Sequence, residues 1–401
     1  MSLGALSPFG RGANAPLAGC TVMQVVPPLA LGGDERATLA VAQALIHAGA
    51  RALVASEPSN LVSELQALGG LHIPFAASNK NPLAMAMNVR RLARVIEEEG
   101  VDLVHARTRS AAWMAVGACR RTRRPLVTTV QGEAPRKSAP LGFETASIDG
   151  DCVMAPSQFA AERASDSFPS ALNRLRIVRP GLDLARLACE GVNRVRVAKV
   201  REEWGAALHE RVVLAPARLT AARGQRFVIE AAGLLKERKV ADIRFVLAGE
   251  AVRAAYGREL DALIAKRGLK SVVGRMSALT DRPAAFVAAS LVVFPTSEPE
   301  GISRTTLEAA AMGALVVVSD VGPAREVVAA PPHAPPEARS GWLAPPNDAT
   351  ALADAIEAAL TLGASAREAI RTRSRARIAE NYSLERMMRD TLGVYAEALT
   401  K

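Results

Sequence analysis

The chain has 401 residues, 49% of them apolar and 22% charged, so it exceeds what one hydrophobic core usually supports and is too apolar to be disordered. Its net charge of +10 indicates an acidic partner such as phosphate or an anionic membrane, although arginines spread along the chain also fit a biased genome composition. Aromatic residues make up only 4% and do not interleave with the basic clusters, so we expect no nucleic-acid partner.

The first segment, residues 1–19, is rich in Gly, Pro and Ala and lacks the continuous apolar stretch of a signal peptide, which predicts a flexible leader. The longest apolar runs, such as AAAMGALVVV, reach only about half a membrane span. Four widely spaced cysteines without metal-ligand spacing indicate a reducing compartment. We therefore expect a cytoplasmic protein. The basic segments NVRRLARV and CRRTRRP allow peripheral contact with the anionic inner face of a membrane, and ordinary solvated helix faces are the alternative.

Short apolar runs rich in β-branched residues alternate along the chain with segments of helical period. In order, the runs are VMQVV, ARALVAS, VDLVHA, RPLVTTV and DCVMAPS, then RVVLAPA, IRFVLAG, SLVVFPTS and ALVVVSD. Continuous apolar strands separated by helices are typical of parallel sheets covered on both faces. The sequence therefore predicts an α/β fold of two Rossmann-like, doubly wound domains, residues 20–190 and 191–382, facing a cleft at their strand ends. A last helix, residues 383–401, is expected to pack back toward the first domain.

Two loops at predicted strand ends carry residues suited to an anionic ligand. Gly32 and Gly33 precede a helix and would let the backbone approach a phosphate or sugar closely. Arg218 and Arg223 lie five positions apart in a loop that ends in Gly224 and a second helix. Two fixed cations beside a helix N-terminus would clamp a diphosphate, and a solvated basic loop is the alternative.

The segment EPEGISRTTLEAAAMG holds Glu300 and Glu308, eight positions apart, where a loop enters a helix. One interpretation is a capping box from Thr305 to Glu308, in which the carboxylate only reaches back to the helix start. The other is a ligand site with Glu300 in the loop, Glu308 one turn inside, and free N–H groups between them aimed at an anion.

Taken together, these loops follow a recognisable order. It runs GGDER, VDLVHARTRS, PLVTTVQG, VMAPSQFAAE, VRPGLDLARL, PARLTAARGQ, FVLAGE, FPTSEPEGISRTTLEAAAMG, SDVGPAREVV and GWLAPPNDATALADAI. The order resembles family 4 of the retaining glycosyltransferases, which have the GT-B fold of two Rossmann-like domains. The resemblance extends from about Thr21 to the C-terminus, and its most specific parts are the paired glutamates and the arginine loop.

The resemblance implies a role for each candidate residue. Arg218, Arg223 and Gly224 would hold the diphosphate of a nucleotide-sugar, with UDP as the expected nucleotide, and Glu308 would accept hydrogen bonds from the ribose. Glu300 and the segment Gly301, Ile302 and Ser303 would hold the transferred sugar, while Gly32 and Gly33 would meet the phosphate from the N-terminal domain. His105 and Gln131 would lie near the acceptor and the reacting bond; a histidine with no ligand role is the alternative for His105.

The implied reaction is hexosyl or N-acetylhexosaminyl transfer, with retained configuration, to a cell-surface glycan or lipid-linked acceptor, as in polysaccharide or lipopolysaccharide biosynthesis. Arginines and helix N-termini would neutralise the leaving diphosphate, so no metal or other cofactor is expected. The one Asp-x-Asp pattern, Asp149-Gly150-Asp151, directly precedes a strand and is interpreted as structural.

Three positions depart from the family pattern. Arg223 stands where lysine is frequent, Ile302-Ser303 where Phe-Gly is frequent, and Gln131 where histidine is usual. A non-catalytic GT-B protein that binds nucleotide-sugar or partners another transferase is therefore the second hypothesis. A dinucleotide oxidoreductase is disfavoured because no G-x-G-x-x-G with a following acidic residue opens either half.

Overall fold

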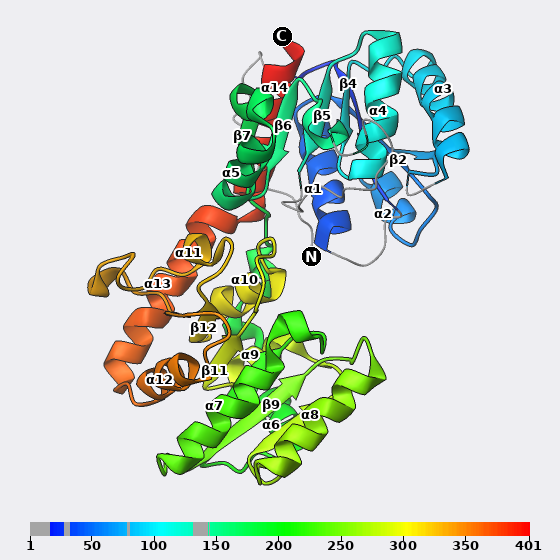
Figure 1. The fold of residues 1–401 in the computed structure, drawn as a ribbon. Coiled ribbons are helices and arrows are strands. Elements are labelled where there is room, and N and C mark those ends of the chain that lie inside the picture. Colours follow the sequence, from blue (N-terminus) through cyan, green and yellow to red (C-terminus); the bar gives the residue numbers. More distant parts are fainter. Residues whose placement is uncertain (1–16, 28–32, 78–80, 131–142, 144) are drawn as a thin grey trace. The chain divides into compact units, whose positions relative to one another are not determined.

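The computed structural model describes residues 17–27, 33–77, 81–130, 143 and 145–401. The chain divides into two compact units, the first comprising Met1–Gly181 and Leu384–Lys401 and the second Leu182–Ser383 (Figure 1). The first unit ends at Gly181 and not at residue 190, because Leu182, Leu184 and Leu187 pack into the core of the second unit.

Unit 1 contains a seven-stranded parallel sheet in the order β3-β2-β1-β4-β5-β6-β7. Its strands are β1 (Thr21–Val25), β2 (Arg51–Ser56), β3 (Leu71–Pro74), β4 (Leu103–Ala106), β5 (Leu126–Thr129), β6 (Cys152–Ala155) and β7 (Leu175–Ile177). Its α-helices are α1 (Gly33–His47), α2 (Val62–Ala67), α3 (Pro82–Glu98), α4 (Arg109–Thr122), α5 (Gln158–Ser167) and α14 (Leu384–Leu399).

Both faces of this sheet are covered by helices. Side chains alternate along each strand, so Val22 lies in a core cluster with α1 and α14, whereas its neighbour Met23 lies in a cluster with α3 and α4. The central strands β1, β4 and β6 are buried at every position. This two-sided burial explains the continuous apolar runs in their sequences.

The two ends of unit 1 are both anchored to its sheet or helices. Leu17 is buried, and the N–H of Gly19 donates to the carbonyl of Gly49 at 2.9 Å, so residues 17–19 are not part of the flexible leader that was predicted over residues 1–19. The rest of that segment lies outside the described residues. At the other end, α14 packs against α1 and strands β4 to β6. The guanidinium Nε of Arg176 donates to Glu397 Oε2 at 2.7 Å and ties α14 to β7.

Unit 2 contains a six-stranded parallel sheet in the order β10-β9-β8-β11-β12-β13. Its strands are β8 (Arg211–Pro216), β9 (Ile243–Ala248), β10 (Val273–Met276), β11 (Leu291–Phe294), β12 (Val316–Ser319) and β13 (Trp342–Ala344). Its α-helices are α6 (Arg194–Glu203), α7 (Gln225–Glu237), α8 (Ala254–Lys266), α9 (Arg282–Ala288), α10 (Arg304–Ala311), α11 (Ala324–Val327), α12 (Ala349–Leu360) and α13 (Ala364–Tyr382).

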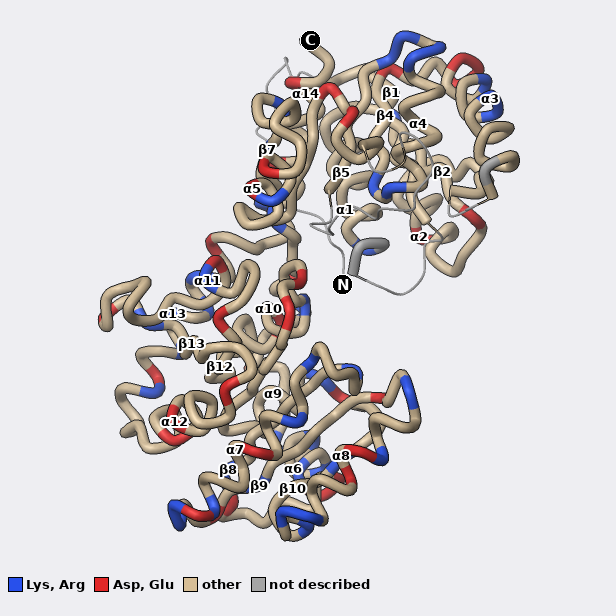
Figure 2. The backbone as a smooth tube through the Cα atoms, viewed as in Figure 1, with Lys and Arg blue, Asp and Glu red and all other residues tan. Residues whose placement is uncertain are grey.

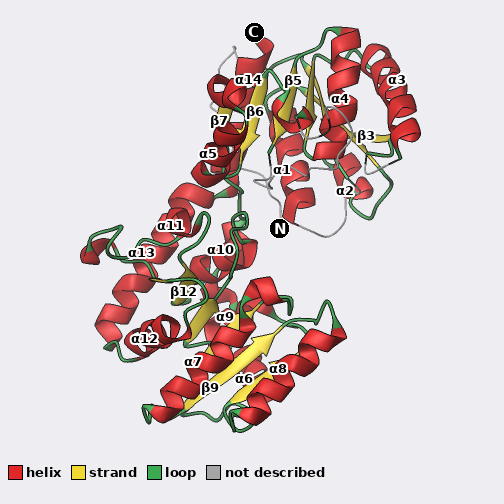
Figure 3. Ribbon diagram, viewed as in Figure 1, coloured by secondary structure: helices red, strands yellow, loops and turns green. Residues whose placement is uncertain are grey.

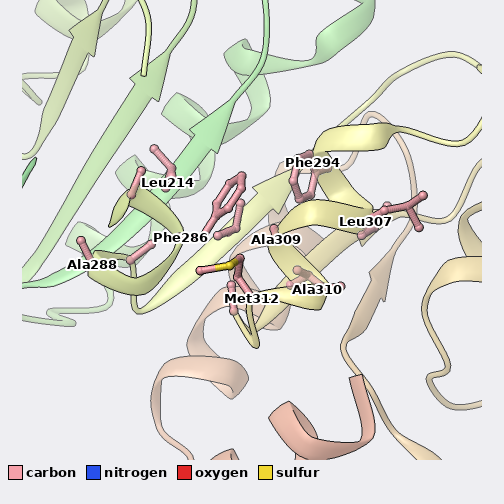
Figure 4. Packing of buried hydrophobic residues seen from close by; sticks show 14 of the residues in the cluster. Leu214, Phe286, Ala288, Phe294, Leu307, Ala309, Ala310 and Met312 are labelled. Atoms are coloured by element: carbon pink, nitrogen blue, oxygen red, sulfur yellow. The ribbon is translucent and has the colours of Figure 1, made fainter. Parts of the chain in front are cut away.

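This second sheet is also sandwiched between helices (Figure 3). On one face, Phe286 of α9, Leu307 of α10 and Met312, the C-cap of α10, belong to one core cluster with residues of the strands (Figure 4). On the other face, α7, α8 and α12 cover alternate residues of the same strands. The predicted α/β fold of two doubly wound parallel-sheet domains is therefore confirmed.

Four strands were not predicted, namely β3, β7, β10 and β13, and each lies at an edge of its sheet. Among the described residues, no helix is both long and apolar enough to cross a membrane.

Candidate functional site

A pocket of about 380 Å³ opens in unit 2 beside the carboxyl ends of β8 and β11. The loop after β8, the loop after β11 and the first turn of α10 supply its walls. Its charged and hydroxyl lining residues are Arg218, Arg223, Thr296, Glu300, Ser303, Arg304 and Thr305. The structure thus brings together the two sequence segments that were singled out as ligand-binding.

The arginine loop is held tightly against the end of β11. Gly224 has φ of 69° and is the N-cap of α7, and a Cβ atom at this position would collide with the carbonyl oxygen of Pro295. The buried amide of Gln225 donates to the carbonyl oxygen of Arg218 at 3.0 Å. Only glycine therefore fits at position 224, and the backbone that carries both arginines is fixed from two sides.

The two arginines differ in their contacts. Arg223 Nη2 forms an ion pair with Glu300 Oε2 at 2.7 Å, which links the two loops across the pocket. Arg218 is exposed, and its guanidinium forms no ion pair with any described residue. One cation of the pair is therefore anchored by protein, and the other is available to a ligand.

Helix α10 starts two residues earlier than a capping box at Thr305 would require. Ser303 is the N-cap, and its Oγ accepts the N–H of Thr306 at 3.3 Å. The Glu308 carboxylate does not reach back to the helix start but accepts from two guanidinium groups, Arg282 Nη1 at 2.6 Å and Arg304 Nε at 2.9 Å. The capping-box interpretation of Glu308 is therefore wrong.

Glu308 also does not face the pocket in this structure. Its side chain is only 10% exposed and is not part of the pocket lining, whereas Arg304 is 40% exposed and lines the pocket. Its assignment as a ribose acceptor stays a prediction.

His105 lies on β4 in unit 1 and is 1% exposed. Its Nδ1 hydrogen-bonds the hydroxyl of Tyr395 on α14 at 2.7 Å, and its Nε2 hydrogen-bonds Thr129 Oγ1 at 2.8 Å. Burial, with a smaller contribution from Arg107, holds the pKa of His105 well below its ordinary value, so the ring is neutral at physiological pH. This geometry favours the alternative of a structural histidine, and a catalytic role stays a prediction.

Other candidates are placed only in part. Gly33 is the first residue of α1, while Gly32 and Gln131 lie outside the described residues. In the Asp-x-Asp segment, Asp151 Oδ2 accepts the N–H of Leu126 at 2.8 Å, and Asp149 lies 3.8 Å from Arg120 Nη2. Both carboxylates therefore have partners within their own unit.

Arg282 and Arg304 were not predicted. Arg304 could have been found from sequence, because its four-residue spacing to Glu308 places the two side chains on one helix face. Arg282 could not, because it reaches Glu308 from α9, 26 residues earlier, and only the packing of α9 beside α10 brings them together.

Two protein-family models match this chain, and they cover different parts of it. A family model described as Glycosyl transferases group 1 matches residues 197–377, and one described as Glycosyltransferase Family 4 matches residues 31–186. A D-inositol 3-phosphate glycosyltransferase of Xylanimonas cellulosilytica is 28% identical over 92% of each chain. The same-named protein of Salinispora tropica is 30% identical over 67% of this chain, and the match spans 56% of that relative.

Solved structures lead to the same class. The crystal structure of a glycosyltransferase from Rickettsia africae superposes with a TM-score of 0.83 at 26% identity and covers 96% of this chain and 99% of its own. The Anabaena protein HepE, crystallised with UDP, shares the fold with a TM-score of 0.77 at 20% identity and covers 94% and 100%. The two parallel-sheet domains therefore form a GT-B fold. The chain belongs to the family 4 and group 1 glycosyltransferases.

Proposed function

We propose that the protein is a retaining, metal-independent glycosyltransferase that moves a hexosyl or N-acetylhexosaminyl group from a UDP-sugar to a cell-surface glycan or lipid-linked acceptor. The observation that carries the proposal is the charge of the pocket in unit 2. Its lining contains three arginines against one glutamate, a net charge of +2. This charge complements the doubly ionised diphosphate of a nucleotide-sugar.

The chemistry follows from where that charge lies. As the bond between the anomeric carbon and the phosphate oxygen breaks, negative charge grows on the leaving diphosphate. Arg218, Arg223 and the N-terminus of α10 stabilise this charge. The acceptor hydroxyl forms the new bond on the same face of the sugar and gives its proton to the leaving phosphate, so no carboxylate nucleophile is required.

Glu300 is assigned to the sugar hydroxyls. Its pairing with Arg223 at 2.7 Å keeps the carboxylate beside the diphosphate end of the pocket, where the transferred sugar begins. Gly301, Ile302 and Ser303 line the same wall and supply backbone groups to the sugar. Gly322, with φ of 61°, supports this loop closely, since a Cβ atom there would lie 3.0 Å from the carbonyl oxygen of Glu300.

A lipid-linked acceptor is consistent with the exposed arginines of unit 1, which include Arg90, Arg91 and Arg94 on α3 (Figure 2). Leu83 and Met87 on the same helix are 79% and 68% exposed. Co-sedimentation with anionic and neutral vesicles tests peripheral binding: preference for anionic vesicles that weakens with salt is expected. Equal binding to both vesicle types would contradict it.

The function itself is tested by thermal-shift screening against UDP, GDP, ADP and their sugars, because a ligand that binds only the folded state raises its stability. The stabilising nucleotide-sugar is then incubated with acceptors that include inositol 3-phosphate, the substrate in the names of two relatives. Sugar transfer, or slow release of sugar into water, is expected. Tight binding with no turnover would instead make the chain a nucleotide-sugar-binding protein, and binding of no nucleotide would contradict both.

A further inference from the structure

Arg304 is the one arginine of the pocket that is tied to a buried carboxylate. It is the first residue of α10, and its Nε donates to Glu308 Oε1 at 2.9 Å. The Glu308 side chain is 10% exposed. Because a guanidinium has five N–H donors in a rigid fork, this single contact fixes its plane and leaves the two terminal nitrogens for other acceptors.

Glu308 is itself held from its other side. Arg282 Nη1 donates to Glu308 Oε2 at 2.6 Å from α9. The residue before it, Asp281, caps α9 by accepting the N–H of Ala284 and forms a two-point ion pair with Arg196 of α6. A connected set of contacts through α6, α9 and α10 therefore fixes the carboxylate that orients Arg304.

We infer that Arg304 is a third cation of the diphosphate site, positioned by Glu308. The inference rests on the proposed function. Arg304 lines the same pocket as Arg218 and Arg223, whereas Glu308 is not part of the lining. The N–H groups of the first turn of α10 lack partners within the helix and favour an anion at the same end. In this protein the second glutamate of the pair therefore serves the phosphates through Arg304.

An ordinary surface ion pair offers a direct comparison. Arg226 and Glu230 have the same four-residue spacing near the start of α7, with Arg226 Nη2 3.2 Å from Glu230 Oε1. Arg226, however, does not line the pocket. Arg226→Gln therefore removes the same charge from a neighbouring helix start in the same unit, and it is the matched control for Arg304→Gln.

The experiment is calorimetric titration of the full chain with UDP and with uridine. Arg304→Gln should raise the Kd for UDP by about tenfold or more, the scale of a hydrogen bond to a charged group, and leave the Kd for uridine within about threefold. Arg226→Gln should change both by less than about twofold. An unchanged Kd for UDP in Arg304→Gln, or an equal loss in Arg226→Gln, would overturn the inference.

Glu308→Gln tests the anchoring role. If Glu308 acts through Arg304, the double variant Arg304→Gln/Glu308→Gln should bind UDP no more weakly than Arg304→Gln alone. Additive losses, with lost preference for UDP over 2′-deoxy-UDP in Glu308→Gln, would show that Glu308 contacts the ribose by itself. If Arg304→Gln does not fold, Arg304→Lys replaces it, with an expected intermediate loss. A parent chain that binds neither UDP nor GDP would overturn the proposed function as well.

Discussion

The two sheets place polar side chains at the same kind of position, the carboxyl end of a parallel strand, yet treat them differently. In unit 1, His105 on β4 has both ring nitrogens in hydrogen bonds to Tyr395 and Thr129 and is almost fully buried. In unit 2, Arg218 follows β8 and is exposed in a pocket of about 380 Å³. A polar residue at a strand end is therefore not sufficient for a site.

The difference comes from what covers each strand end. In unit 1 the C-terminal helix α14 packs on β4 to β6 and delivers Tyr395 to the histidine, so its polar groups are satisfied internally. In unit 2 the loop after β8 is held against the end of β11 at Gly224, and the guanidinium of Arg218 in this loop forms no ion pair with any described residue. Buried polar groups stabilise when paired, whereas exposed and preorganised charges serve a ligand.

The largest expected effect is on stability, and it concerns Tyr395, the hydrogen-bond partner of the buried His105. Tyr395→Ala should lower the free energy of unfolding by about 3 to 5 kcal/mol, because it leaves a cavity and an unpaired buried histidine. Tyr395→Phe, which removes only the hydroxyl, should cost about 1 to 3 kcal/mol. Denaturant unfolding measures both, and the affinity for UDP should not change. Lost transfer without lost stability in Tyr395→Phe would instead place His105 in the active site.

For the arginines of the unit 2 pocket we expect the opposite result, a loss of affinity with little loss of stability. Arg218→Ala and Arg223→Ala should each weaken nucleotide-diphosphate binding by about 1.5 to 3 kcal/mol, the range for hydrogen bonds to charged groups, with little change in stability. Calorimetry measures the affinity and thermal unfolding the stability. Unchanged affinity in both variants would remove the phosphate site. A larger loss for Arg218→Ala would show that the arginine without an ion pair among the described residues contributes more to binding than Arg223.

A pH prediction follows from the buried histidine. The pKa of His105 in the folded protein lies well below 6.5, so as pH falls through 6.5 the unfolded state takes up a proton that the folded state does not. Stability should then fall by at most about 1.4 kcal/mol per pH unit until the folded pKa is reached. Comparison of the parent with His105→Gln by denaturant unfolding at pH 7 and pH 5.5 isolates this contribution. Identical slopes would contradict it.

A further prediction concerns Gln131, which follows β5 in the sequence and lies outside the described residues. A glutamine amide can donate to a sugar hydroxyl but cannot take up a proton at neutral pH, so we predict a positioning role. Gln131→Ala should lower kcat at least tenfold, about 1.4 kcal/mol, and leave nucleotide affinity nearly unchanged. Parent-like turnover would exclude a catalytic role, and transfer that arises only in Gln131→His would favour the nucleotide-sugar-binding protein.

The central strands could be predicted from sequence because both of their faces are buried, as in β12, which is buried at every position. The edge strands could not. In β3, β7 and β10 the half-exposed faces carry His72, Arg176 and Arg275, which interrupt the apolar pattern.

Some features of the candidate site could likewise be predicted from sequence, and others could not. The segments that carry Arg223 and Glu300 could each be singled out from their own residues and their order along the chain, whereas the ion pair between these two residues was not predicted. The contacts that decide how His105 and Glu308 behave come from Tyr395, 290 residues away, and from Arg282, 26 residues away. Tertiary packing sets such contacts, and no local spacing indicates them.

The smallest expected effect is that of metal removal on sugar transfer. It follows from the contrast between side chains that have partners within the protein and side chains that face the pocket. The Asp-x-Asp carboxylates of unit 1 have partners, since Asp151 accepts the N–H of Leu126 and Asp149 lies beside Arg120. The countercharge for a diphosphate comes instead from the arginines of the unit 2 pocket. EDTA should therefore leave transfer within about twofold of the untreated enzyme, far from the loss that removal of a catalytic cation causes.

The matched test is Asp151→Asn, which should lower stability and leave the EDTA response unchanged. A large loss with EDTA that Mg²⁺ or Mn²⁺ restores would mean that the arginines do not suffice, and a loss that disappears in Asp151→Asn would locate the metal at the Asp-x-Asp segment.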